Sequence, residues 1–289
     1  MNYIAVVNTI NRPQYFVERC LKKILNQKIK PLKVFLIDQN RIGLTLSTET
    51  LNHPLLERKK VNFKSVSAAR NSVVIPEDAD WIFFCDDDGY PCENYSELLD
   101  SIIIKNPTLQ ILAGSIVRED TKEFYSLRHK KGGSLKKFRN TKNLMGSNFV
   151  IKAAAFDFLE RFDENFGVGA YWGSSEETDF CWKAFFNNIP MEFFPELKVY
   201  HVPPFNESIR SGFKKSFRYG IGKGALVYKW LIRKRKIIVI YEFIEMLIMP
   251  FFLSLLSIVK LKPQLIATNF AALAGRLTGF IKAIFINKI

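Results

Sequence analysis

Three consecutive carboxylates, Asp86–Asp88, are the residues whose type and spacing are most suited to chemistry. They follow the mostly apolar run Trp81–Cys85 and precede Gly89 and Pro91. Adjacent carboxylates repel one another, and carboxylate oxygens are the ligands that Mg²⁺ and Mn²⁺ prefer. A solvated turn is the structural alternative, because Asp-Gly with a nearby Pro favours turns. The motif alone is equally compatible with both, and the apolar strand that leads into it favours a divalent cation.

A second group of acids stands in the segment SSEETDF. Acids in the first turn of a helix interact favourably with its dipole, which is a sufficient structural reason for Glu176, Glu177 and Asp179. The chemical alternative is a general base, which needs a carboxylate on a rigid element facing the substrate. Taken by themselves, these acids favour the structural explanation.

Three further polar residues are candidates for a functional site. His201 in VYHVPP follows an apolar run, and a lone histidine is usually structural. Together with the acids it becomes a candidate metal ligand. Arg70 and Asn71 in SAARN are either a surface pair on a helix or a phosphate-binding pair, since a guanidinium group grips phosphate well.

Alternating strand and helix patterns surround these residues. Apolar β-branched runs predict buried strands, and apolar residues spaced three and four apart predict helices. This alternation predicts an α/β domain with a mainly parallel sheet, in which ligands bind at the carboxyl ends of the strands. Asp38 and Asp86–Asp88 each follow a strand, so we expect them to face one crevice. The predicted strands are residues 3–9, 33–38, 81–85, 109–117 and 198–202, and the predicted helices are residues 13–25, 67–75, 93–105 and 174–188.

The segment 118–143 is polar and basic, with Gly132–Gly133 in its middle, and predicts a long flexible loop. Within it, residues 122–142 carry many cations. They form either a solvated loop or a lid that orders over a nucleotide or an acceptor diphosphate.

The composition limits the class of protein. The chain has 289 residues, of which 48% are hydrophobic, and this excludes disorder throughout and allows one large domain with an appendage or two modest domains. Its four cysteines lack CxxC spacing and indicate buried side chains in a reducing compartment. The N-terminus, MNYIAVVNTINRP, has no basic segment followed by a long apolar run. We therefore expect no signal peptide and a cytosolic catalytic body.

The positive charge is concentrated in the C-terminal part. From Val199 onward there are 15 Lys and Arg residues and three acids, so this part carries +12 of the net charge of +14. Such a charge suggests a nucleic-acid binder or a membrane-surface protein, and long apolar segments beside the cations favour the membrane. A nucleic-acid partner is not expected, because no recognition motif accompanies the charge.

Two apolar stretches, Ile237–Val259 and Leu265–Ile286, follow a basic segment at 208–236. Both stretches contain charged residues, and each charge typically costs about 2.5–3.5 kcal/mol at the centre of a membrane span. We therefore favour helices that lie in the cytosolic leaflet, singly or as a hairpin, over two spans. Each cation of RKRK at 233–236 would contribute about 1 kcal/mol at anionic head groups. A helical subdomain or an oligomer interface is the alternative.

The order of the motifs carries a resemblance that no single motif does. The chain gives TINRP, a strand ending in Asp38, SAARN, FFCDDDGYP, FDENFG, EETDFCWKA and VYHVP. This order closely resembles the family 2 glycosyltransferases, which have the GT-A fold. The resemblance covers roughly residues 3–205, about seven tenths of the chain.

The resemblance implies a role for each matching position in a nucleotide site. Thr9 and Arg12 would border the nucleotide pocket, and Asp38 would hydrogen-bond the base. Arg70 and Asn71 would lie near the sugar and the phosphates.

The resemblance also implies a metal site at the aspartates. Asp86 and Asp88 would be the outer pair of a DxD motif, with Asp88 as the direct metal ligand and Asp87 assisting. His201 would complete the metal or diphosphate site. The cofactor implied is a divalent cation, Mn²⁺ or Mg²⁺.

The catalytic base is where this sequence departs from the family. The helix after FDENFG usually begins with Glu-Asp, the Asp being the base, whereas Glu177 stands at that position here. A Glu at this position is one methylene longer than the Asp of the family, which leaves two candidates for the base: Glu177, at the matching position, is the first and Glu176 is the second. In-line attack assisted by one base implies inversion at the anomeric carbon.

These implications predict a metal-dependent, inverting glycosyltransferase that moves a sugar from a nucleotide diphosphate sugar, most often a UDP-sugar in this family, to a hydroxyl group. The C-terminal part adds the expectation of a lipid-linked glycan acceptor at the cytoplasmic face of the cell membrane, in bacterial-type surface polysaccharide synthesis. We expect a GT-A domain at 1–205 and a helical membrane-associating region at 206–289, and a homo-oligomer is compatible with both.

The sequence allows two rival functions. A sugar nucleotidyltransferase would need a Gly-rich phosphate loop after the first strand, where NTINRP has no glycine. A non-catalytic membrane-surface adaptor with a degenerate transferase body would require the acids to be dispensable.

Overall fold

The computed structural model describes residues 1–131, 134–203 and 208–286. The chain divides into two compact units. Unit 1 comprises Met1–Lys64, Ala68–Phe162 and Phe180–Pro203, and unit 2 comprises Ser65–Ser67, Asp163–Asp179 and Pro204–Ile289. The expected domain boundary between residues 205 and 206 lies outside the described residues.

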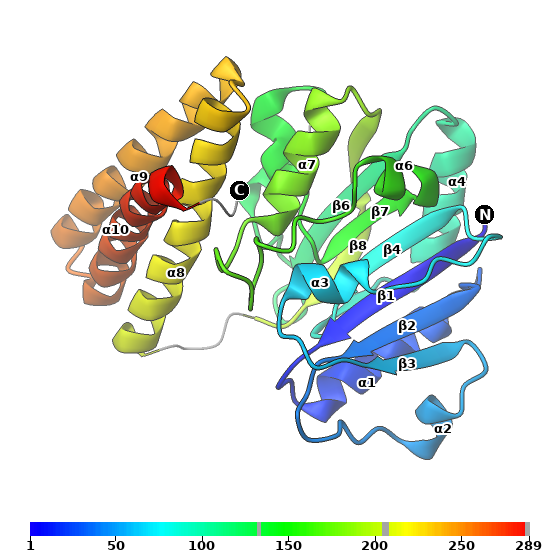
Figure 1. Ribbon diagram of the computed structural model, residues 1–289. Helices are drawn as coiled ribbons and strands as arrows, with labels where there is room; N and C mark the ends of the chain where they lie inside the picture. Colours follow the sequence, from blue (N-terminus) through cyan, green and yellow to red (C-terminus); the bar gives the residue numbers. More distant parts are fainter. Residues whose placement is uncertain (132–133, 204–207, 287–289) are drawn as a thin grey trace. The chain divides into compact units, whose positions relative to one another are not determined.

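An eight-stranded sheet forms the centre of unit 1 (Figure 1). Its strand order is β3-β2-β1-β4-β7-β6-β8-β5. Strands β3, β2, β1 and β4 are parallel, β7 is antiparallel to both β4 and β6, and β6 is parallel to β8. The short edge strand β5 is antiparallel to β8. The strands are β1 Tyr3–Thr9, β2 Lys33–Asp38, β3 Leu56–Lys60, β4 Trp81–Asp86, β5 Gly89–Pro91, β6 Ile111–Arg118, β7 Asn148–Lys152 and β8 Met191–His201.

Helices cover both faces of this sheet. On one face α1 and α4 pack against side chains such as Ala5, Val7 and Leu36. On the other face residues of α3, α6 and α7 pack against Ile4, Val6 and Phe84. Every residue of β1 is buried, as the apolar run predicts for a strand covered on both sides. The helices that contribute residues to unit 1 are α1 Gln14–Leu25, α2 Thr48–Leu51, α3 Val66–Asn71, α4 Tyr95–Lys105, α5 Leu127–Lys131, α6 Ala153–Phe158 and α7 Glu176–Phe186.

The strand register brings the predicted polar residues to one edge of the sheet. Thr9 pairs with Asp38 across β1 and β2, and Asn8 pairs with Asp86 across β1 and β4. Because these strands are parallel, their carboxyl ends coincide. Asp38 and Asp86 therefore lie at the same edge of the sheet, as the strand pattern predicts, while the single crevice expected of them stays a prediction.

Several predicted elements differ from the observed ones. Strand β3 was not predicted, because its sequence LERKK lacks apolar alternation. The helix expected over residues 67–75 ends at Asn71. The flexible loop expected over residues 118–143 is wrong for much of its length, because it contains α5 and a 3-10 helix at Phe138–Asn143. Its side chains Leu135 and Phe138 are buried, whereas Gly132–Gly133 lie outside the described residues.

Unit 2 contains a group of three long helices, α8 Ile209–Tyr228, α9 Ile240–Val259 and α10 Pro263–Phe285. A π-helical turn, Lys229–Arg233, continues α8, and a 3-10 turn, Ile237–Val239, precedes α9. Helix α10 packs closely on α8 through glycines: a methyl group at Gly224 would overlap the backbone of α10, and one at Gly279 would overlap the backbone of α8. Small residues at four-residue spacing allow this approach.

One helical segment in the described part of the chain, Ile237–Val259, is long and apolar enough to cross a membrane by its length and composition. It exposes apolar side chains along its length, among them Ile244, Phe251 and Leu255. Its location at a membrane stays a prediction.

Candidate active site

Asp87 and Asp88 form the turn between two strands, and Asp86 ends the first of these strands. β4 ends at Asp86 and β5 begins at Gly89, which pairs with His201 of β8. A Cβ at Gly89 would lie only 3.1 Å from Val199 Cγ1, so glycine allows the close approach of β5 to β8. This ladder carries His201 to the aspartate turn although more than a hundred residues separate them in sequence.

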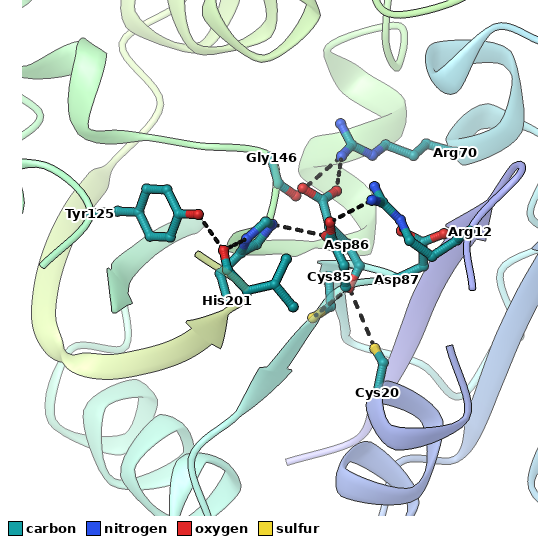
Figure 2. Close-up of polar contacts among 11 residues, drawn as sticks. Arg12, Cys20, Arg70, Cys85, Asp86, Asp87, Tyr125, Gly146 and His201 are labelled. Atoms are coloured by element: carbon teal, nitrogen blue, oxygen red, sulfur yellow. Dashed lines mark hydrogen bonds and ion pairs between the residues drawn. The ribbon is translucent and has the colours of Figure 1, made fainter. Parts of the chain in front are cut away.

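Asp86, Asp88 and His201 form a cluster that could hold a metal ion. Each offers one ligand atom, and these atoms lie within 4.8 Å of one another. Figure 2 shows the His201 imidazole directed at the aspartate turn, and its Nε2 lies 2.9 Å from Asp88 Oδ1. Two carboxylates and an imidazole are suitable donors for a divalent cation such as Mn²⁺. The residues therefore fit the cation that the sequence predicted.

The proximity of these groups changes their protonation. Burial lowers the pKa of His201, but the hydrogen bond and charge of Asp88 and the charge of Asp86 raise it to about 9. Burial raises the pKa of Asp88, but the bond from His201 and the charges of His201 and Arg12 bring it below its ordinary value. At neutral pH the structure therefore holds a protonated imidazole against a carboxylate.

Tyr125 helps to fix the imidazole. Its hydroxyl donates to the carbonyl oxygen of Val202, and His201 Nδ1 donates to the same oxygen over 3.1 Å. The Tyr125 ring meets the His201 ring edge-on at 5.4 Å. Hydrogen bonds of this kind orient metal-binding histidines. Sequence reasoning missed Tyr125, because it lies in the segment expected to be a loop and has no spacing signal.

Arg12 links the aspartate turn to the end of β1. Its Nε lies 3.1 Å from Asp87 Oδ1, and its Nη1 lies 2.9 Å from Asp88 Oδ2 (Figure 2). Burial raises the pKa of Asp87 to about 6, against the opposing charge of Arg12. Asp87 thus anchors Arg12, and the assisting role at the metal that was expected of Asp87 stays a prediction.

Arg70 and Asn71 make different contacts. Arg70 is buried, and its Nη2 lies 3.1 Å from Asp86 Oδ1 and 3.3 Å from Gly146 O. Asn71 makes a two-way amide pair with Phe162, donating to its carbonyl and accepting from its N–H. Arg70 is therefore part of the aspartate cluster, while the observed contacts of Asn71 hold the backbone at Phe162.

Asp38 is fully buried, and both of its oxygens accept hydrogen bonds from the protein. Oδ1 accepts from Asn40 N at 3.0 Å and Asn40 Nδ2 at 2.8 Å. Oδ2 accepts from Arg58 Nε at 3.1 Å and Arg58 Nη2 at 2.5 Å. A carboxylate has about four acceptor positions, so this arrangement uses them all. Its predicted bond to a nucleotide base stays a prediction and would require one of these bonds to change.

A cavity of about 410 Å³ lies at the ends of β1 and β2. Its polar lining includes Asn11, Arg12, Asn40, Arg41 and Lys64. Asn40 is held there from both sides, because its Oδ1 accepts from Asn11 N at 2.6 Å while its amide donates to Asp38. Donors and cations around an open space at a strand edge suit an anionic, hydrogen-bonding ligand.

Thr9 lies at the same edge, because it is the last residue of β1. It is buried, and its carbonyl oxygen accepts from Gln39 N at 2.9 Å. Its predicted place at the border of a nucleotide pocket stays a prediction.

The candidate bases stand in the first turn of α7, as predicted. Ser175, just before the helix, has a φ of 75°, a left-handed conformation that is uncommon for a residue with a side chain. Glu176 is buried and Glu177 is half-buried. Both belong to unit 2, whereas the aspartates belong to unit 1, so a site that the two groups share stays a prediction.

The fold resembles that of solved structures. No protein-family model matches the sequence, and no curated protein matches it. The crystal structure of S. aureus TarS 1–349 in complex with UDP-GlcNAc matches with a TM-score of 0.56 and 15% identity, covering 80% of this chain and 67% of that one. Another crystal structure of S. aureus TarS matches with a TM-score of 0.54 and 16% identity, covering 80% of this chain and 40% of that one.

The chains share a fold. The expected class, a mixed GT-A-type α/β sheet flanked by helices and followed by a helical C-terminal part, is thereby confirmed. Identities of 15% and 16% show a common fold and do not show a common activity.

Proposed function

We propose that the chain is a metal-dependent, inverting glycosyltransferase that takes a sugar from a nucleotide diphosphate sugar, with UDP-sugars favoured. The observation that carries the proposal is the convergence of Asp86, Asp88 and His201 at the carboxyl edge of the sheet, beside a polar cavity. The shared fold supports it, since the TarS structure holds UDP-GlcNAc.

The residues divide the work in a way that suits a diphosphate leaving group. Arg12 both contacts the aspartate turn and lines the cavity. It can therefore lie between the nucleoside and the diphosphate of one bound nucleotide. A cation held by Asp86, Asp88 and His201 would offset the negative charge that develops on the departing nucleotide. Glu177, or Glu176 as the second candidate, would take the proton of the acceptor hydroxyl as that oxygen attacks the anomeric carbon.

We also propose a lipid-linked glycan as the acceptor, at the cytoplasmic face of the cell membrane, in the synthesis of a surface polysaccharide. The support is the exposed apolar side of α9, with the cations Arg233–Lys236 just before it. Apolar area together with cations binds an anionic bilayer surface. A homo-oligomer is compatible with this arrangement.

The donor and the metal can be tested together. The full chain in detergent is scanned for thermal stabilisation by a panel of nucleotide diphosphate sugars, each with Mn²⁺, with Mg²⁺ and with chelator. We expect one nucleotide class to stabilise the protein and chelator to remove most of the effect. If no sugar nucleotide stabilises the chain, the proposed donor class is wrong. If chelator does not change the stabilisation, the proposed metal dependence is wrong.

Two substitutions test metal binding and general-base catalysis separately. Asp88→Asn should abolish the metal-dependent part of the thermal shift. Glu177→Gln should leave that shift intact and lower kcat by about 10²–10⁴-fold, the usual contribution of a general base. The control is Asp157→Asn, which alters an exposed carboxylate paired with Arg161. If Glu176→Gln loses kcat while Glu177→Gln does not, the assignment passes to Glu176.

The acceptor and the membrane need their own test. We expect the enzyme to stay with membranes that are washed with carbonate. Complete release into the wash would indicate that the C-terminal helices form only a soluble subdomain. A soluble sugar acceptor used as well as a polyprenyl-linked one would contradict the lipid-linked acceptor.

A further inference from the structure

A buried ion cluster within unit 2 joins the two ends of the segment 163–179. Lys229 Nζ lies 2.8 Å from Asp163 Oδ2 and 2.8 Å from Asp179 Oδ1. Trp230 Nε1 donates to the same Asp179 oxygen over 2.7 Å. Lys229 is 6% exposed and Asp179 fully buried, so water contributes little to solvating either charge.

Lys229 holds the two ends of the segment 163–179 together. Asp163 is the first residue of the segment and Asp179 lies in the first turn of α7, so one ammonium group ties residues sixteen positions apart. The Phe166 ring also lies 4.9 Å from Lys229 Nζ, a favourable distance for a cation–π contact. Loss of one member of such a cluster leaves the other charges buried and unpaired, which is more damaging than loss of a surface ion pair.

The closed segment carries the candidate bases. Its inner backbone bonds run from Gly167 N to Ser174 O at 3.2 Å and from Trp172 N to Asn165 O at 2.9 Å. A Cβ at Gly167 would lie 3.2 Å from Glu176 Cδ, so the turn also packs on the Glu176 carboxyl group. The position of Glu176 and Glu177 therefore depends on how the segment is held.

The residue that holds it comes from the C-terminal helices. Lys229 and Trp230 open the π-helical turn Lys229–Arg233 that follows α8. Consecutive side chains of this turn reach one carboxylate oxygen of Asp179. Turns of this type occur often at functional sites.

We infer that Lys229 is a positioning residue: it closes the segment Asp163–Asp179, fixes the first turn of α7 and its glutamates, and so makes the C-terminal helices part of the catalytic machinery. The inference rests on the proposed function for its catalytic consequence, whereas the closure itself is a structural claim. The chain offers a matched control in Lys223, whose Nζ forms an ion pair of 2.6 Å with the buried Glu242 between two of the C-terminal helices.

The first measurement is independent of activity. Hydrogen exchange is followed in the full chain in detergent for the wild type, Lys229→Met, Lys229→Arg and Lys223→Met. The amides of Gly167, Trp172 and Asp179 should exchange faster in Lys229→Met, and remain protected in the arginine variant and in the control. Unchanged exchange of these amides in Lys229→Met would overturn the inference.

The second measurement is steady-state transfer with the donor found for the wild type. Misplacement of a reacting group by about 1 Å costs about 100-fold, so Lys229→Met should lower kcat by about that factor while the KM for the donor stays within about twofold. Lys229→Arg should recover most of kcat, because it restores the charge. A kcat for Lys229→Met no lower than that for Lys223→Met would overturn the catalytic claim.

A further variant covers the case in which Lys229→Met does not fold. Asp163→Asn removes one charge of the cluster at a residue that is 19% exposed, and it should raise exchange in the same segment and lower kcat. No change in either would contradict the inference. A wild-type chain that transfers no sugar would defeat the proposed function, while the exchange arm would still decide whether Lys229 closes the segment.

Discussion

The ion pair between Arg58 and Asp38 gives a prediction whose size follows from the structure. Asp38 is fully buried, and Arg58 supplies two of its four hydrogen bonds, at 3.1 and 2.5 Å. Arg58→Met keeps the aliphatic stem and removes the charge. The carboxylate would then be buried with only the two bonds from Asn40 to stabilise it.

Removing one partner of a buried ion pair typically costs about 3–5 kcal/mol. The Arg58 side chain is 26% exposed, so water that enters after its removal can replace part of the hydrogen bonding that Arg58 gave to Asp38. We therefore expect the lower end of that range, a loss of about 3 kcal/mol in the free energy of unfolding of unit 1. For a domain of this size such a loss lowers Tm by about 6–12 °C.

The pH dependence has a definite sign. Burial raises the pKa of Asp38, but the bonds from Arg58 and Asn40 outweigh it and hold the pKa below 3.8. A carboxyl group with a depressed pKa stabilises the fold fully above pH 3.8, and the stabilisation is lost as pH falls through the folded pKa. The difference in Tm between the wild type and Arg58→Met should therefore be largest near neutral pH and shrink in acid.

The assay is a thermal double-mutant cycle with Asp38→Asn. The effects of the two substitutions should be strongly non-additive, because either one removes the same interaction. The control is Arg118→Met, which breaks the exposed pair with Asp120 and should cost less than about 1 kcal/mol. Additive effects, or a Tm for Arg58→Met no lower than for Arg118→Met, would refute the reasoning.

Two more predictions concern stability. Gly279→Ala should destabilise the packing of α10 on α8 by about 1–3 kcal/mol in thermal unfolding, because the added methyl group would overlap the Ile221 carbonyl oxygen, whereas Gly43→Ala, with no heavy atom within 4 Å, should be neutral. His129 is fully buried and its Nδ1 accepts from Ile116 N at 3.1 Å; burial, with a smaller effect from the charge of Arg128, lowers its pKa from 6.5 to about 4. Its neutral form therefore stabilises the fold above pH 6.5, and up to about 3 kcal/mol is lost as pH falls from 6.5 to 4, so unfolding curves of His129→Asn should depend less on pH across that window.

The edge of the sheet that carries the candidate site could be predicted because its signals are local. A buried parallel strand is recognised from a few consecutive apolar residues, and the residue that ends it must lie at the carboxyl edge. The positions of Asp38 and Asp86 could therefore be predicted without any information about contacts between distant segments. The position of His201 is different, since it depends on the pairing of β5 with β8. The sequence made it a candidate ligand only through the company of the acids and through the resemblance.

The partners of these residues could not be predicted, because they depend on register and packing between distant segments. Arg58 reaches Asp38 from β3, an edge strand whose charged sequence gives no periodic signal. Lys229 meets Asp163 and Asp179 through a π-helical turn that apolar spacing does not reveal. The loop expected at 118–143 was wrong for a related reason: its few apolar residues are too widely spaced to show a period, yet Leu135 and Phe138 are buried.

The aspartate triplet itself supports the metal less strongly than its sequence suggested. Three adjacent acids were expected to need a cation to offset their repulsion. In the structure Asp86 faces Arg70, Asp87 faces Arg12, and Asp88 faces both Arg12 and His201. The fold thus supplies protein cations to all three carboxylates, and repulsion alone no longer demands a metal ion. The argument for the cation depends instead on the convergence of two carboxylates and an imidazole. The pairing of β5 with β8 brings His201 to the aspartates, although the arginines alone already offset much of their charge.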